Sequence, residues 1–357
     1  MKHGLAIAPT SPTLRPITRV EDLVSQGLVT VDAGEALQPV VDRFQLRITP
    51  EIAALIERDT ADGPIRSQFI PDERELIIQA NELKDPIGDD AHSPVRGITH
   101  RYPDRVLLKP THLCQVYCRF CFCREKVGSG AEQLSDAELD VALAYIADHP
   151  EIFEVILTGG DPFVLSDRRL AKIFDGLQSI PHVAVVRLHT RVATVDPDRI
   201  TPDLIRILRR RFATWIGVHV NHVSELTTAA SDAIARLVDA GFPLVSQTVL
   251  LRGVNDRVDT LTDLMRALVR LRVKPYYLHH LDFAEGTSHF RVPLDVGKRL
   301  VADLRGQLTG LAQPTYILDI PGGFGKVPIE PDWVEKVSER HYRVRDWQGR
   351  IHDYEDI

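Results

Sequence analysis

The chain of 357 residues has a net charge of −7 at pH 7, a pI of about 6.1 and a mean hydropathy of −0.10. This acidic chain lacks the excess of Lys and Arg that is typical of nucleic-acid-binding proteins. No uncharged apolar run approaches the roughly 20 residues of a membrane-spanning helix. The N-terminal stretch MKHGLAIAPTSPTLRP lacks a long apolar core, so we expect a cytoplasmic protein rather than a secreted one.

Two kinds of segment follow one another along the chain. Residues 1–95 are predicted to be mainly helical, and a stretch near 85–95 that contains Pro and Gly leads into the next region. From about residue 104, apolar β-branched runs predict strands at 106–109, 153–158, 183–189, 214–220, 243–250, 274–280 and 315–320. Amphipathic stretches between them predict helices at 135–147, 167–179, 201–211, 229–240, 256–271 and 294–308.

This alternation predicts parallel βαβ units, and six or seven units favour a complete or incomplete β/α barrel. Ser135 and Glu138 form a plausible capping box for the first of the helices, and Gly241 is a plausible helix stop. We therefore divide the chain into a helical region at 1–95, a barrel at 96–320, and a final segment at 321–357 with a short C-terminal tail.

All four cysteines lie in the run THLCQVYCRFCFC, which directly follows the first predicted strand. Cys114, Cys118 and Cys121 have the spacing C-x₃-C-x₂-C, and three thiolates on one short loop suit an iron–sulfur cluster. Three ligands leave one iron of a 4Fe–4S cluster open to a substrate or cofactor. Clustered thiols also favour a reducing cytosol.

Two other interpretations of the cysteines remain open. Structural zinc usually takes four protein ligands, and here Cys123 or His112 would have to supply the fourth. A redox pair can be assigned to Cys118 and Cys121, but it leaves Cys114 without a role.

Polar residues follow the predicted strands at their carboxyl ends, where β/α barrels gather their chemistry. The second strand runs into Gly159-Gly160-Asp161, and residues without Cβ let backbone approach a ligand closely. The last strand runs into DIPGGFGK, whose Lys326 lacks the Walker spacing of a phosphate loop. A lysine amine placed over a barrel mouth can instead attach pyridoxal phosphate (PLP) covalently.

Several motifs taken together resemble lysine 2,3-aminomutase, a family that uses a radical S-adenosylmethionine (SAM) reaction together with PLP. They are CRFC, GGDP, HVNH, SQTVLLRGVND, YYLHHLD with the following HFRVP, and DIPGGFGKVP, within residues 95–328. The resemblance implies an incomplete (β/α)6-type radical SAM barrel with a 4Fe–4S cluster. It also implies an isomerase that moves the α-amino group of L-lysine to C3, giving β-lysine.

The resemblance assigns roles to individual residues. Cys114, Cys118 and Cys121 would hold the cluster, and Lys326 would carry PLP. Segments that border SAM in the family correspond to Gly159, Gly160, Asp161, His219 and Gln247. Candidates for the PLP phosphate are Arg105 and Arg101, and Asp282 and Asp319 match the carboxylates that hold the ε-ammonium of lysine.

One position departs from the family pattern. The second residue after the third cluster cysteine is normally an arginine that binds the substrate carboxylate, and here it is Cys123. Because a thiol cannot replace a guanidinium, we expect Arg124, Arg119 or another cation to take its place, or the affinity to be weaker.

Three hypotheses follow for function and partners. The leading one is a lysine aminomutase that depends on a reducing donor such as flavodoxin or ferredoxin and forms a possible homo-oligomer. Its chain length is closer to the shorter branch that supplies β-lysine to elongation factor P. The others are an aminomutase for another basic amino acid, and a non-catalytic iron–sulfur or zinc protein.

Overall fold

The computed structural model describes residues 15–128, 133–329 and 331–357. Residues 1–14, on which the expectation of no secretion signal depends, lie outside this part. The N-terminal region contains the helices α1 (Val20–Ser25), α2 (Val31–Arg43), α3 (Pro50–Glu57) and α4 (Pro64–Phe69). These helices share an apolar core, and this core also contains Val116 from the cysteine loop. The N-terminal region therefore packs directly on that loop.

The main sheet has nine strands in chain order, from β1 to β9. The strands β2 to β8 are parallel to one another, and β1 and β9 pair antiparallel at the two edges. Their bounds are β1 (Ile98–Tyr102), β2 (Arg105–Thr111), β3 (Glu154–Gly159), β4 (Val185–Thr190), β5 (Ala213–His219), β6 (Leu244–Val249), β7 (Val273–His279), β8 (Thr315–Ile320) and β9 (Gly325–Pro328).

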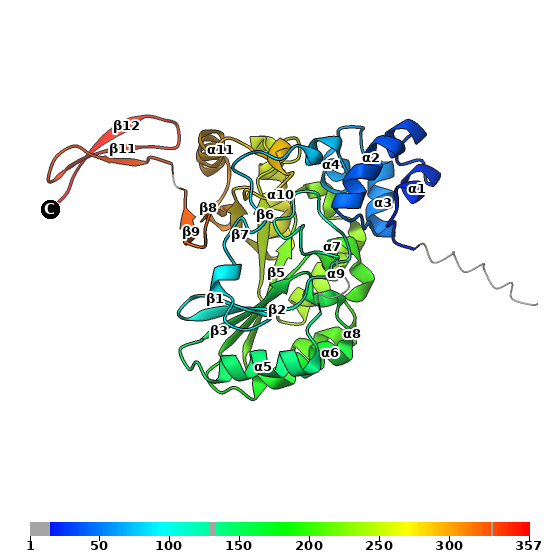
Figure 1. Cartoon of the computed structure of the whole chain (residues 1–357). Helices are drawn as coiled ribbons and strands as arrows, with labels where there is room; N and C mark the ends of the chain where they lie inside the picture. The colour runs from blue at the N-terminus through cyan, green and yellow to red at the C-terminus, as the bar shows by residue number, and fades with distance from the viewer. Residues whose placement is uncertain (1–14, 129–132, 330) are drawn as a thin grey trace, which may run out of the picture.

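The connecting helices lie around this curved sheet (Figure 1). Their bounds are α5 (Asp136–Ala147), α6 (Asp167–Gln178), α7 (Val192–Val195), α8 (Pro202–Leu208), α9 (Thr228–Asp239), α10 (Val258–Arg270) and α11 (Leu294–Gln307). The capping box of Ser135 and Glu138 is present at α5, and Gly241 has the positive φ of +91° that suits a helix stop. The partial barrel expected from the alternating pattern is confirmed.

Successive side chains along the strands point alternately into an outer apolar core and toward the inner face of the barrel. In β4, Val186 and Leu188 are buried in the core between sheet and helices. The neighbouring Arg187 and His189 instead line a cavity inside the sheet. Because successive side chains of a strand point to opposite faces, the polar residues of this strand are gathered inside the barrel.

The two edge strands, which the sequence did not predict, approach each other at the open side of the barrel. The Tyr102 hydroxyl at the end of β1 accepts a hydrogen bond of 2.7 Å from the backbone N–H of Lys326 in β9. A Cβ on Gly88 would lie 2.4 Å from the backbone nitrogen of Gly323. The segment that precedes β1 therefore packs closely on the loop that carries Lys326.

The C-terminal tail contains a second sheet of three antiparallel strands, β10 (Val334–Lys336), β11 (His341–Arg345) and β12 (Ile351–Glu355). Figure 1 shows β11 and β12 extending away from the barrel. None of the helices in the described parts of the chain has the length and apolar character needed to cross a membrane.

Candidate functional site

A cavity of about 500 Å³ lies inside the barrel, where the carboxyl ends of the parallel strands meet. Its walls contain every residue to which the sequence assigned a site role: Arg101, Arg105, Cys114, Cys118, Cys121, Gly159, Gly160, Asp161, His219, Gln247, Asp282, Asp319 and Lys326. These residues come from positions more than 200 apart in the chain, so the strand-end pattern correctly predicted that they meet.

The three spaced cysteines reach this cavity from the loop after β2. Burial is the main cause that raises the pKa of Cys114 well above its usual value and that of Cys118 to about 11. The Arg191 guanidinium donates a hydrogen bond of 2.9 Å to the sulfur of Cys118. A buried thiol with a fixed cation beside its sulfur is suited to hold a metal, because metal binding replaces the proton and yields a thiolate.

The donor set suits a cluster better than a single ion. In the described parts of the chain, no group of three or more His, Cys, Asp or Glu side chains converges on a position for one metal ion. A 4Fe–4S cluster binds each cysteine through a different iron, so its ligands surround a larger volume. Three cysteines on the wall of one cavity meet this requirement.

Arg119 and Arg124, which flank the third cysteine, are bound to one buried carboxylate outside the cavity. The Arg119 Nε donates to Glu75 Oε1 at 2.9 Å, and the Arg124 guanidinium forms an ion pair with the same carboxylate. Glu75 belongs to a 3₁₀ turn (Glu73–Leu76) of the N-terminal region. Of the expected replacements for the missing arginine at Cys123, Arg124 and Arg119 are therefore wrong, while another cation or a weaker affinity stays a prediction. Both guanidiniums fix the cysteine loop to the N-terminal region.

The glycine pair after β3 packs against the cysteine loop. A Cβ on Gly160 would lie 2.2 Å from the carbonyl oxygen of Leu113, and Gly159 has a φ of +100°. The N–H of Asp161 donates to the carbonyl of Leu113 at 2.9 Å. The absence of a Cβ at these glycines thus allows the backbone to pack closely on the loop that holds the cysteines.

The Asp161 carboxylate is directed into the protein. It accepts hydrogen bonds from the backbone N–H of Phe163 and Arg191, at 2.9 and 2.7 Å, and from the Thr190 hydroxyl at 3.0 Å. Burial nevertheless raises its pKa to about 6. The carboxylate therefore has a structural role, because it caps two turns. A ligand could be bound through the backbone of Asp161.

Three histidines bring neutral imidazoles into the cavity. Burial lowers the pKa of His219 and of His279 to about 3, and it lowers that of His189 well below the usual value. The Nε2 atoms of His189 and His219 are buried and have no hydrogen-bond partner within the described residues. Buried polar atoms without partners are rare in folded proteins, so these two nitrogens mark positions where a ligand atom would be accommodated.

Lys326 and the two aspartates form the acidic end of the cavity. The Lys326 ammonium forms an ion pair with Oδ2 of Asp319, which is buried, whereas Oδ1 has no hydrogen bond within the described part of the chain. Burial, followed by the negative charge of Asp319, raises the pKa of Asp282 to about 7. Two carboxylates that repel each other in this way provide a site for a cation.

The two arginines proposed for a phosphate differ in their surroundings. Arg101 donates to Asp89 Oδ1 at 2.9 Å and to the carbonyl of Ile87 at 2.6 Å, so an anion would have to compete for it. Arg105 lies 3.8 Å from the centroid of the Tyr102 ring, and its ion-pair partner among the described residues is the exposed Asp104. Arg105 is therefore the more available cation.

Sequence reasoning missed several residues that line the cavity: Lys109, Arg187, His189, Arg191, Tyr276, Tyr277 and His279. Arg191 is the most connected of them, because its guanidinium also contacts Glu225 at 2.7 Å and Gln68 at 2.6 Å. The available signal was position, since His189-Thr190-Arg191 ends one strand and His279 ends another.

Comparisons with known proteins agree with this arrangement. The sequence model of the Radical SAM superfamily matches residues 108–265, which contain the cysteine loop and most of the barrel. This places the fold and the cysteine site among radical SAM proteins. A second model, described as Lysine-2,3-aminomutase, matches residues 301–357.

Comparison with individual proteins, which match nearly the whole chain, gives a more specific result. The L-lysine 2,3-aminomutase of Clostridium subterminale is 40% identical, over 95% of this chain and 82% of the relative. That of Bacillus subtilis is 38% identical over 95% of this chain and 72% of its own. The glutamate 2,3-aminomutase of Clostridioides difficile is 35% identical over 95% and 80%. The chain belongs to the lysine 2,3-aminomutase family.

Membership in this family confirms the expected class of enzyme, an isomerase that moves an amino group within an amino acid. It also confirms the expected cofactors, because the family uses a 4Fe–4S cluster and SAM together with PLP. The alternative of a non-catalytic iron–sulfur or zinc protein does not agree with relatives that are aminomutases over most of their length.

Proposed function

We propose that the protein converts L-lysine to β-lysine by moving the α-amino group to C3. The observation that carries this proposal is the carboxylate pair of Asp282 and Asp319 on the wall of the cavity. Burial and mutual repulsion make this pair a site for a cation, and the ε-ammonium of lysine is a cation at the far end of the substrate. Glutamate would place a third negative charge there.

The cofactor positions follow from the chemistry of the donors. Cys114, Cys118 and Cys121 hold the cluster, and Lys326 attaches PLP. The N–H of Gly160 donates to the carbonyl of Thr111 at the end of β2, and that of Asp161 to the carbonyl of Leu113 in the cysteine loop. The backbone carbonyls of this segment are therefore the atoms suited to the SAM amino group. His219 and Gln247 line the same cavity and complete the SAM site. When bound, the cofactors supply an organic radical and an imine that makes nitrogen migration feasible.

The chain itself positions the reactants and excludes water. Arg105 holds the PLP phosphate, while Arg101 is fixed by Asp89 and lies 3.8 Å from Asp319. Asp282 and Asp319 hold the ε-ammonium and thereby fix which carbon of the chain faces the radical. The neutral imidazoles of His189 and His279 border this space without adding charge. Such positioning is the main contribution that a protein makes to cofactor chemistry.

The substrate can be tested directly. Enzyme reconstituted with iron, sulfide and PLP under anoxic conditions is incubated with SAM, a reductant and one of lysine, arginine, ornithine or glutamate, and products are identified by mass spectrometry. We expect β-lysine from lysine. Turnover of glutamate without turnover of lysine would overturn the assignment of Asp282 and Asp319.

A different basic amino acid is the second candidate, because the pair of Asp282 and Asp319 can bind the side-chain cation of ornithine or arginine as well as that of lysine. In the same assay, turnover of arginine or ornithine at a higher rate than lysine would select this candidate.

The setting of the reaction belongs to the same proposal. The cluster requires a low-potential electron donor such as flavodoxin or ferredoxin, and thiol ligands of this kind are best maintained in a reducing cytoplasm. A homo-oligomer and a supply of β-lysine to elongation factor P remain predictions. Light scattering of the purified protein, and assay of the modified factor in a deletion strain, would test them.

A further inference from the structure

An amino acid in this cavity has an anionic end as well as a cationic one. If its ammonium lies between Asp282 and Asp319, its α-carboxylate lies elsewhere in the same enclosed space. A carboxylate removed from water without a partner costs several kcal/mol. The structure must therefore supply a cation, and the thiol of Cys123 on the cavity wall cannot do so.

Most cations on the cavity wall are already occupied. Arg187 donates to both oxygens of Glu154, at 2.9 and 3.2 Å. The Arg191 guanidinium is used by Glu225, Gln68 and Cys118. Arg101 is held by Asp89, and Lys326 is the residue proposed to carry PLP. Arg105 is at the opposite end of β2 from the cysteine loop and suits the PLP phosphate.

Lys109 is the remaining cation of the cavity wall in the described chain. Strand β2 alternates, so that Val106 and Leu108 enter the outer core while Arg105, Leu107 and Lys109 line the cavity. The Lys109 side chain is only 11% exposed. Its ion pair with Asp89 is long, at 3.4 Å from Nζ to Oδ2, so donor capacity of the ammonium remains.

Lys109 and Cys123 line the same cavity. Asp89, which Lys109 contacts at 3.4 Å, is also held by Arg101 at 2.9 Å, so its charge is balanced without the full donor capacity of Lys109. A cation contributed by β2 is therefore available in the cavity where Cys123 contributes none.

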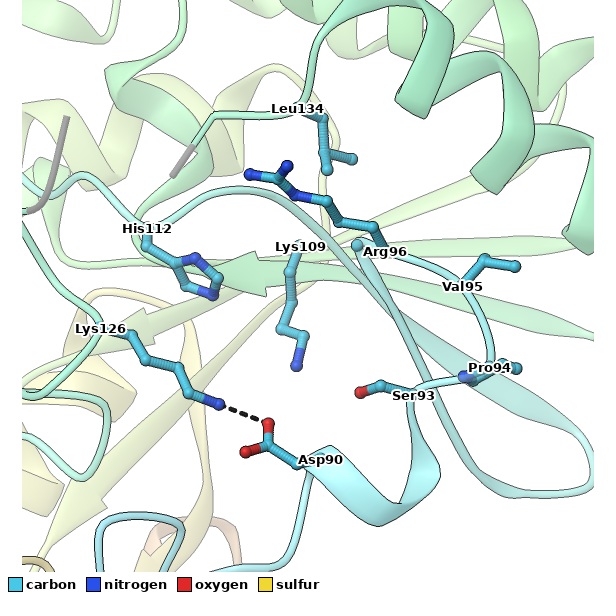
Figure 2. Close-up of a pocket in the computed structure, with 10 residues that line it drawn as sticks. Asp90, Ser93, Pro94, Val95, Arg96, Lys109, His112, Lys126 and Leu134 are labelled. Atoms are coloured by element: carbon cyan, nitrogen blue, oxygen red, sulfur yellow. Dashed lines mark hydrogen bonds and ion pairs between the residues drawn. The ribbon is translucent and has the colours of Figure 1, made fainter. Parts of the chain in front are cut away.

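A neighbouring lysine provides a natural comparison. Figure 2 shows Lys109 and Lys126 in a smaller pocket of about 390 Å³, where Lys126 is paired with Asp90 at 2.6 Å. Lys109 lines both this pocket and the main cavity, whereas Lys126 lines only the smaller one. Asp90 pairs with Lys126, and within the described residues no ion pair joins Asp90 to Lys109.

We propose that Lys109 binds the α-carboxylate of the amino acid substrate and so determines the affinity for it. This inference rests on the proposed function, and it names the second charged contact of the same substrate. Together with Asp282 and Asp319, Lys109 would select molecules that have an anionic group at one end and an ammonium at the other.

The test compares two ligands that differ only in this charge. Binding of L-lysine and of L-lysinamide, which lacks the carboxylate, is measured by calorimetry with cluster- and PLP-loaded enzyme in the absence of SAM. In Lys109→Met we expect the dissociation constant for lysine to rise about 10- to 100-fold, the value of one charge-assisted hydrogen bond. The constant for lysinamide should change less than about threefold.

Three further variants complete the design. Lys336→Met removes an equal charge from the exposed strand β10 and should leave both constants unchanged. Lys109→Arg should retain lysine binding. Addition of Cys123→Arg to Lys109→Met should restore it, because the new guanidinium enters the same cavity. Asp89 keeps its 2.9 Å contact with Arg101 in Lys109→Met, so this variant leaves no unpaired buried carboxylate.

Several results would overturn the inference. Equal weakening of lysine and lysinamide in Lys109→Met would show that the residue only maintains the cavity. Reduced retention of PLP or of SAM, with lysine binding unchanged, would assign Lys109 to a cofactor. If the wild-type enzyme binds glutamate and not lysine, the proposed function itself fails, a result distinct from the other two.

Discussion

The Lys326 ammonium forms an ion pair with the carboxylate of Asp319, and the two residues are direct partners in the pairing of β9 with β8 at the edge of the sheet. In the described chain this lysine is therefore the occupant of the cation site formed by Asp319 and Asp282. Attachment of PLP to the same nitrogen would withdraw it from Asp319, so cofactor binding and the opening of the ammonium site are coupled in one side chain.

Replacement of Lys326 should abolish PLP retention and activity. In Lys326→Ala no amine remains to hold the cofactor, and Asp319 loses its ion-pair partner. We expect PLP content after gel filtration, measured by absorbance following alkaline release, to fall to background. The exposed Lys336 in β10 is the control, and Lys336→Ala should retain PLP. A Lys326→Ala protein that still holds stoichiometric PLP would assign the attachment to another lysine.

Lysine binding should release protons near neutral pH. Burial and Asp319 raise the pKa of Asp282 to about 7, so this carboxyl is partly protonated in the substrate-free enzyme. An incoming ammonium favours the ionised form, and affinity should improve as the pH rises from 6 to 8. Calorimetry in buffers of different ionisation enthalpy measures the released protons. Asp282→Asn should bind lysine weakly and without proton release, and an unchanged proton count in that variant would contradict the assignment.

The same pKa has a consequence for stability. An aspartate has an ordinary pKa of about 4. With Asp282 at about 7, the folded protein holds an extra proton between these values. Its free energy of unfolding therefore falls as the pH rises through this window, by about 1–3 kcal/mol in total for this group. Asp282→Asn should stabilise the substrate-free enzyme at pH 8 and have little effect at pH 4. Thermal unfolding at both pH values, with wild type alongside, checks the sign.

The carboxylate of Glu75 should be essential for the cysteine loop. Glu75→Gln removes the common partner of Arg119 and Arg124 and leaves two buried guanidiniums without a counter-charge. Breaking a buried ion pair costs about 3–5 kcal/mol, so we expect a large loss in unfolding free energy and incomplete iron incorporation. Denaturant unfolding and iron content per chain are the measurements. Glu73→Gln, in the same turn but exposed, is the matched control, and equal iron loss in both variants would refute the role of Glu75.

The sequence predicted the elements whose pattern is local. The strand at 315–320 agrees with β8 at both ends, and the other six strands agree within about two residues at most boundaries. Apolar periodicity is strong there because each strand packs its outer face against a helix. The edge strands β1 and β9 were missed, since ITHRY and GKVP are short segments with few aliphatic residues, and they pair because the barrel brings them to an edge.

Site residues that belong to a motif could be predicted from the sequence. Roles that depend on contacts between distant parts of the chain could not. Cysteine spacing, the glycine pair and Lys326 were found because their residue types are informative by themselves. The common partner of Arg119 and Arg124 could not be predicted from the sequence, because Glu75 is more than 40 residues away in the chain and the pairing depends on tertiary packing. Lys109 was overlooked for a similar reason, since one cation in an apolar strand acquires meaning only once its neighbours are known.

Glu75 binds Arg119 and Arg124 on both sides of the third cysteine, so the N-terminal region holds the cysteine loop in place. For a loop that carries the proposed cluster, we expect cluster assembly and docking of the N-terminal region to be cooperative. Loss of iron should then make the chain sensitive to proteolysis first in the N-terminal region.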